Sequence, residues 1–161
     1  MELDKEKDKN DLLKENIFLL FLSVITKIPY IIIGKPGSLK RLSVQLISQS
    51  MRGKYSKDTF FKKFPLLIQT YYQGSESSKP EDKETLFEIA ENKLKYYINN
   101  KDKQEELTPI SMVLFDELNL AERSKSNPLK VLRHKLEYNG NISDISFVGI
   151  SNYLLNTTII N

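Results

Sequence analysis

Eight residues with the composition of a phosphate-binding loop run from Gly34 to Arg41, in the order GKPGSLKR. Against the Walker A pattern G-x-x-x-x-G-K-[ST], this segment keeps Gly34 and Lys40 at the required spacing. The backbone N–H groups and the lysine of such a loop bind the phosphates of a nucleotide. The candidate nucleotide-binding residues are therefore Gly34, Lys35, Pro36, Gly37, Ser38, Leu39, Lys40 and Arg41.

Two positions of this loop depart from the pattern. Leu39 replaces the second glycine and adds a side chain where backbone is expected to approach phosphate closely, although Gly37 still offers a permissive backbone position. Arg41 replaces the serine or threonine whose hydroxyl contacts Mg²⁺, and it adds a positive charge beside the magnesium position. Taken alone, the segment is also compatible with a glycine-containing turn between a strand and a helix that carries a surface lysine.

Two carboxylates follow an apolar run that is typical of a buried strand, in the order SMVLFDE. They are Asp116 and Glu117, and a strand end of this kind projects both into the crevice at the edge of a sheet, as in a Walker B motif. Asp116 is the candidate ligand of Mg²⁺, through water, and Glu117 is the candidate general base that polarises the attacking water. A buried strand that emerges into a solvated acidic turn would have the same sequence pattern.

A third strand end carries polar residues in the segment FVGISN. Asn152 at its end is a candidate to hydrogen-bond the γ-phosphate or to position water, although an asparagine after a strand is more often a turn residue. The three segments support one another, because they fall on three separate strand ends in the order that nucleoside-triphosphate chemistry requires.

Alternating helices and strands are predicted to position these segments. Apolar or β-branched runs predict four strands, over 30–33, 66–72, 110–115 and 145–150. Apolar residues at helical spacing and proline positions predict five helices, over 11–26, 39–51, 56–64, 81–97 and 129–136. This alternation indicates an α/β fold with a mostly parallel central sheet, and with the loop motif it indicates the three-layer sandwich of a P-loop NTPase.

Two of these helices have predicted buried faces. The face of the helix over 39–51 is expected to consist of Leu42, Leu46 and Ile47. The face of the helix over 81–97 is expected to consist of Leu86, Ile89, Ala90, Leu94 and Tyr97.

Length and composition limit the classes of function. A chain of 161 residues fits one compact domain, and residues 1–10, which carry charges of both signs, are expected to be flexible. The 24 Lys and Arg residues against 21 Asp and Glu residues are scattered, so no nucleic-acid partner is expected. Without cysteine and with one histidine, disulfides, zinc ribbons, thiol nucleophiles and multi-histidine metal sites are excluded.

The apolar segment over 17–33 raises the question of a membrane span. Lys27 and Pro29 interrupt it, so neither half approaches the roughly 20 residues that a spanning helix needs. The amino terminus lacks a signal-peptide pattern, and the expected compartment is the cytoplasm.

The ordered motifs resemble the AAA+ units of the mysterin family, giant dynein-like AAA+ proteins with a RING ubiquitin-ligase module. The resemblance covers roughly residues 12–155 and is carried by GKPGSLKRL, VLFDELNLAERSKSNPLKVL, HKLE and FVGISNYLL. The family has a GKPGSSKSL-like phosphate loop, a LDEVGLAE-like acidic strand with a following N/MPLK segment, and a GISNW-like sensor segment.

The resemblance assigns roles to matching residues of this chain. It implies that Lys40 is the phosphate-binding lysine, Asp116 the magnesium aspartate, Glu117 the catalytic glutamate and Asn152 the sensor asparagine. Serine stands in the family where this chain has Leu39, so the missing second glycine is partly a family trait. Serine also stands where this chain has Arg41, and that departure puts magnesium-dependent hydrolysis in doubt.

The function implied is that of an ATP-binding AAA+ core, with ATP and Mg²⁺ as cofactors and other AAA+ units or the rest of a larger chain as partners. Whether it hydrolyses ATP to drive remodelling is left open, since a non-hydrolysing structural or interaction module is the alternative. Arg41 and Leu39 favour the alternative, whereas the intact Asp116-Glu117 pair favours hydrolysis.

The boundaries of the resemblance set further expectations. Residues 1–161 are expected to form a single AAA+ core that is incomplete at its carboxyl end, without an arginine finger, a fifth strand or a helical lid. RING-like Cys/His spacing is absent from the sequence, so no ubiquitin-ligase module is expected in this chain. A nucleotide kinase fits less well, because it would need a complete phosphate loop and an arginine-bearing lid.

Overall fold

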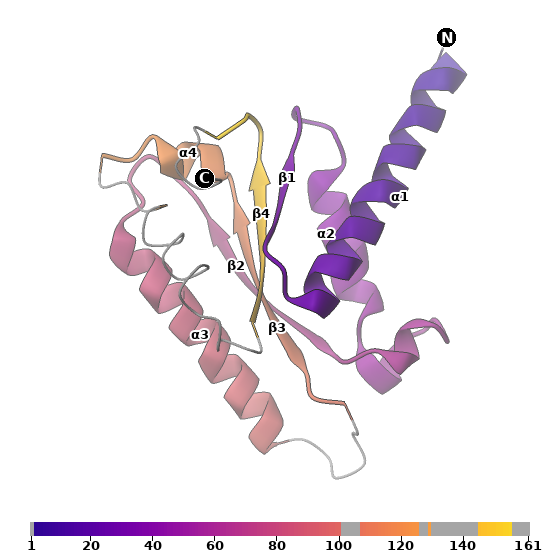
Figure 1. Cartoon of the computed structure of the whole chain (residues 1–161), viewed down its shortest axis with the longest axis vertical. Helices are drawn as coiled ribbons and strands as arrows, with labels where there is room; N and C mark the ends of the chain where they lie inside the picture. Colours follow the sequence, from indigo (N-terminus) through magenta and orange to yellow (C-terminus); the bar gives the residue numbers. More distant parts are fainter. Residues whose placement is uncertain (1, 101–106, 126–128, 130–144, 156–161) are drawn as a thin grey trace.

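A parallel four-stranded sheet forms the centre of the molecule, in the order β1-β4-β3-β2 (Figure 1). The computed structural model describes residues 2–100, 107–125, 129 and 145–155. The strands are β1 (Tyr30–Ile33), β2 (Leu67–Gln73), β3 (Ile110–Asp116) and β4 (Ile145–Ser151). The α-helices are α1 (Glu2–Thr26), α2 (Lys40–Ser50), α3 (Pro80–Asn99) and α4 (Leu118–Glu122).

Helices cover both faces of this sheet, which makes three layers (Figure 1). Helices α1 and α2 pack on one face, and α3 and α4 pack on the other. The first core includes Leu20, Val24, Val44, Ile47, Met112 and Ile150. The second core includes Leu86, Phe87, Phe115, Leu118 and Phe147. Every residue of β3 and β4 is buried because these two strands lie in the middle of the sheet, which explains why their sequences are mostly apolar.

The carboxyl ends of the strands meet at one edge, because all strand pairs are parallel. Ile33 at the end of β1 lies opposite Ser151 at the end of β4, and Gln73 at the end of β2 lies opposite Asp116 at the end of β3. The predicted α/β fold with a parallel sheet is therefore confirmed, and so is the placement of the three polar segments at strand ends.

Two helical predictions need correction or extension. The segment predicted as a helix over 56–64 instead contains one short 3₁₀ helix, η2 (Phe61–Lys63), and a second 3₁₀ helix, η1 (Gly53–Tyr55), precedes it. The side chain of Asp58 accepts a hydrogen bond from the backbone N–H of Phe60 at 2.7 Å, which turns the chain and brings the Phe60 and Phe61 rings onto Phe21 of α1. Helix α4 was not predicted, because its five residues are too few to show a helical period.

Three further predictions concern the start of α1, the helix over 129–136 and a membrane span. Helix α1 begins at Glu2 rather than at residue 11, so residues 2–10 continue the helix, and their flexibility stays a prediction. The helix predicted over 129–136 lies outside the described residues except for Leu129, which is buried in the second core. No helix in the described part of the chain is long and apolar enough to cross a membrane.

The buried faces of α2 and α3 also differ in part from expectation. On α2 the buried stripe starts at Lys40 itself and continues through Ser43, Val44 and Ile47, so Leu42 is exposed. On α3, Phe87 is buried instead of Ile89 and Tyr97, which are exposed. In both helices the neighbouring sheet sets the rotation, and apolar spacing alone does not determine it.

Candidate functional site

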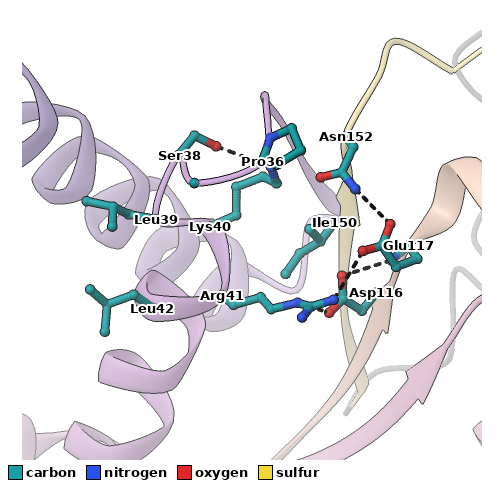
Figure 2. A pocket seen from close by; sticks show the side chains of 11 residues that line it. Pro36, Ser38, Leu39, Lys40, Arg41, Leu42, Asp116, Glu117, Ile150 and Asn152 are labelled. Carbon is teal, nitrogen blue, oxygen red and sulfur yellow. Dashed lines mark hydrogen bonds and ion pairs between the residues drawn. The ribbon is translucent and has the colours of Figure 1, made fainter.

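A cavity of about 300 Å³ lies where the loop after β1 faces the ends of β3 and β4 (Figure 2). Its lining includes the loop, the first turn of α2 and the polar strand ends: Pro36, Gly37, Ser38, Leu39, Lys40, Arg41, Leu42, Asp116, Glu117, Ile150 and Asn152. Gly34 and Lys35 contribute through their backbone carbonyls, which accept hydrogen bonds from the Lys40 ammonium. The structure thus brings together all the predicted site residues.

Two residues of the loop have left-handed backbone conformations. Gly37 has φ +82° and Leu39 has φ 61° and ψ 15°. An added Cβ at Gly37 would meet no atom within 4 Å, so only its backbone angle calls for glycine there. Leu39 has the strained conformation that the second glycine of the Walker A pattern would adopt freely, and its carbonyl accepts the first hydrogen bonds of α2, from the backbone N–H and side chain of Ser43.

Replacing Leu39 by glycine is expected to raise the free energy of unfolding by about 0.5–1 kcal/mol, because relief of the left-handed strain exceeds the extra chain entropy of glycine. Urea denaturation followed by far-ultraviolet circular dichroism measures this change. Leu42→Gly is the matched control, since Leu42 is exposed and lies in regular helix α2. Glycine at position 42 should lower the free energy of unfolding by about 1 kcal/mol. If both variants lost the same stability, Leu39 would not be strained.

Lys40 is buried, and its ammonium group lies under the loop. It donates hydrogen bonds to the carbonyls of Gly34 and Lys35, the latter at 2.9 Å, and to Ser38 Oγ at 3.2 Å. Burial lowers the pKa of Lys40, the charges of Glu117 and Asp116 oppose that shift, and Arg41 adds to it. The lysine is therefore held between the loop carbonyls and an acidic pair, where a phosphate could replace carbonyl contacts.

Arg41 reaches from the start of α2 to both carboxylates (Figure 2). Its Nε lies 2.5 Å from Asp116 Oδ2, and its Nη2 donates a hydrogen bond to Glu117 Oε1 at 3.1 Å. The first contact is an ion pair, and that buried oxygen has no hydrogen-bond partner among the described residues. The close contact with Asp116 and the attraction of its charge raise the pKa of Arg41, which keeps the guanidinium charged.

The other oxygens of the acidic pair also have partners. Asp116 Oδ1 accepts a hydrogen bond from the backbone N–H of Glu117 at 2.8 Å. Glu117 Oε2 accepts one from Asn152 Nδ2 at 2.8 Å, so the glutamate is held from one side by Asn152 and from the other by Arg41. Glu117 itself has φ 53°, an unfavourable conformation that turns the chain from β3 into α4.

Asn119 of α4 is a site residue that the sequence predictions missed. Its side-chain carbonyl accepts a hydrogen bond from the backbone N–H of Asn152 at 3.2 Å, and the residue is buried. A polar residue between Leu118 and Leu120, three positions after Asp116, was the available signal in the sequence. Asn119 joins the end of β4 to the acidic turn and so positions Asn152 beside Glu117.

The arrangement does not fit Mg²⁺ coordination as it stands. Arg41 has no oxygen to offer where a serine or threonine hydroxyl would bind the metal, and it is paired with the carboxylates of both Asp116 and Glu117. Among the described residues there is no group of three or more His, Cys, Asp or Glu side chains that could hold a metal ion. The carboxylates that a divalent ion would contact are already paired with the positive side chain of Arg41.

Sequence comparison with known proteins agrees with the α/β fold of the structure. The profile of the RNF213 AAA domain family matches residues 7–161, nearly the whole chain. The chain belongs to this family. It is therefore an AAA domain, and its parallel four-stranded sheet with helices on both faces is consistent with the α/β core of a P-loop NTPase.

Curated relatives show how this RNF213-type domain compares with longer chains. The human E3 ubiquitin-protein ligase RNF213 is 33% identical over 99% of this chain, and zebrafish (Danio rerio) E3 ubiquitin-protein ligase rnf213-beta is 36% identical over 95%. Mouse E3 ubiquitin-protein ligase RNF213 is 32% identical over 95% of the chain. In each case the chain spans about 3% of the relative's length.

Proposed function

We propose that the chain binds ATP in the cavity between the loop 34–41 and the ends of β3 and β4. The observation that carries this proposal is the position of Lys40, whose ammonium group lies under the loop and close to an acidic pair. The amino terminus of α2 adds backbone N–H groups and a partial positive charge on the same side of the cavity. AAA domains are nucleotide-binding modules, and membership of the RNF213 AAA family supports the same assignment.

We further propose that the domain binds ATP without hydrolysing it at a useful rate. A general base must be free to accept a proton from water, but both carboxylate oxygens of Glu117 are engaged, one by Arg41 and one by Asn152. The module then acts as a binding and structural part beside other AAA+ units or within a larger chain, because its relatives are much longer proteins.

Isothermal titration with ATP tests the binding proposal. Replacing Lys40 by methionine should weaken ATP binding by about 100-fold, because one charged contact to phosphate is lost while the length of the side chain is kept. Lys35→Met is the matched control, because Lys35 belongs to the same loop but is exposed. The affinity of this variant for ATP should differ from that of the wild type by about 3-fold or less. Circular dichroism establishes that both variants are folded.

This titration, together with an assay of phosphate release, distinguishes an ATP-binding domain from a purely structural module and from an ATPase. If the wild-type protein shows no saturable heat at millimolar ATP, the binding proposal fails and a purely structural module remains. If ATP binds and the protein releases phosphate at a rate that Glu117→Gln abolishes, the domain is an ATPase and the second proposal fails. Equal weakening by Lys40→Met and Lys35→Met would show that nucleotide binds by surface charge alone.

A further inference from the structure

The guanidinium of Arg41 lies in the cavity beside Asp116 and Glu117, on the side that faces the loop 34–41 (Figure 2). It contacts Asp116 and Glu117 together, and it belongs to the residue directly after Lys40. Two positive side chains therefore stand against two negative ones, and the group is close to neutral before any ligand enters. A divalent cation would have to displace the guanidinium in order to reach the carboxylates.

The burial of Asp116 makes that displacement unfavourable. The side chain of Asp116 is 1% exposed, whereas that of Arg41 is 63% exposed. If Arg41 moved away, the Oδ2 atom of Asp116 would lose the cation with which it is paired, and it has no hydrogen-bond partner among the described residues. A cation that entered could not use an oxygen from position 41 as a ligand, since arginine has donors only.

The exposure of Arg41 leaves it able to bind phosphate as well. A guanidinium has five N–H donors, and the two contacts with carboxylates use Nε and Nη2. Arg41 lines the cavity together with Lys40 and the loop residues, so its remaining donors are available to an anion there. Arginine is well suited to such a bridge, because its planar donors match the oxygens of carboxylate and phosphate.

We propose that Arg41 is an internal cation that takes the place of the divalent metal ion, so that this site binds ATP as the metal-free anion. This inference rests on the proposed ATP binding. Lys40 and Arg41 together supply the positive charge that Lys40 and Mg²⁺ would otherwise supply, and Asp116 and Glu117 fix Arg41 in place instead of binding a metal. Mg²⁺ in solution lowers the negative charge of ATP and therefore does not strengthen its binding here.

Isothermal titration of ATP in the presence of EDTA and in the presence of excess Mg²⁺ tests the inference. For the wild-type protein we expect the two dissociation constants to agree within about 3-fold, or binding to be tighter with EDTA. Arg41→Ser removes the internal cation and restores a hydroxyl, so its binding should weaken at least about 10-fold with EDTA and recover with Mg²⁺. Arg41→Lys keeps the charge and should stay independent of the metal.

The control for general loss of charge is Arg123→Ser. The side chain of Arg123 is also 63% exposed, but it pairs with Glu76 and does not line the cavity. This variant should bind ATP like the wild type under both conditions.

Two results would overturn the inference, and they differ in what they say of ATP binding itself. If wild-type binding requires Mg²⁺ and falls at least about 10-fold with EDTA, Arg41 does not replace the metal, and the ATP-binding proposal stands. If the folded wild-type protein binds ATP under neither condition, both proposals fail. Circular dichroism of Arg41→Ser shows whether this variant is folded. The titration of Arg41→Lys, which keeps the charge, then distinguishes a loss of affinity from a folding defect.

Discussion

Gly74→Ala is expected to lower the free energy of unfolding by about 2–3 kcal/mol, because an added methyl group has no room at the end of β2. The backbone N–H of Gly74 donates a hydrogen bond to the Asp116 carbonyl at 2.8 Å. A Cβ atom on Gly74 would lie 2.6 Å from the Glu117 carbonyl oxygen and 2.9 Å from Phe115 Cε1. A backbone carbonyl cannot rotate aside as a side chain can, so β2 and the acidic turn must separate.

Urea denaturation followed by far-ultraviolet circular dichroism measures this loss. Gly37→Ala provides the control, because it makes the same chemical change where no atom lies within 4 Å. Its cost should be about 1 kcal/mol and should come from the left-handed backbone alone. A Gly74→Ala variant as stable as the Gly37→Ala variant would show that the acidic turn can move away without loss.

The second large effect is expected in the core. Phe147→Ala should lower the free energy of unfolding by about 3–5 kcal/mol, because the ring is 2% exposed and its removal leaves a cavity between the sheet and α3. The Phe147 ring stacks on that of Phe87, with centroids 6.5 Å apart and an angle of 15° between the planes. Part of the loss should therefore come from this aromatic pair.

Phe18→Ala is the matched control for the core prediction. Phe18 lies in α1 and is 60% exposed, so its truncation should change the free energy of unfolding by about 0.5 kcal/mol or less. The same denaturation measurement applies to both variants. Similar losses for Phe147→Ala and Phe18→Ala would mean that the second core is not closely packed.

The strands could be predicted from the sequence because the sheet is covered on both faces. Such strands are mostly apolar, as in Ile110–Phe115, where the one polar residue, Ser111, is buried and donates a hydrogen bond to the carbonyl of Ala90. The meeting of Lys40, Asp116, Glu117 and Asn152 could be predicted as well, since parallel strands end at one edge. The sequence motifs therefore contained most of the candidate site.

The parts that could not be predicted depend on contacts between distant segments. The 3₁₀ helix η2 lies where the rings of Phe61 and Phe64 pack on Phe21, and α4 follows a left-handed turn at Glu117. The sequence placed the charge of Arg41 near the magnesium position, but it gave no sign that the guanidinium pairs with both carboxylates. That pairing requires the geometry of α2 against β3.

The order of the strands has a consequence for how the chain is made. The first strand, β1, pairs with β4, the last strand in the described part of the chain: Tyr30 lies opposite Val148, and the N–H of Gly34 donates a hydrogen bond to the carbonyl of Ser151. On the ribosome, β2, α3 and β3 emerge and can associate while β1 still has no neighbour to pair with. Bringing β1 and β4 together closes a long loop of chain, and its entropic cost is offset only when the two strands pair. We therefore expect folding to be slow. Until then the edge of β1 that pairs with β4 stays uncovered, and we expect nascent chains to depend on chaperones at this stage.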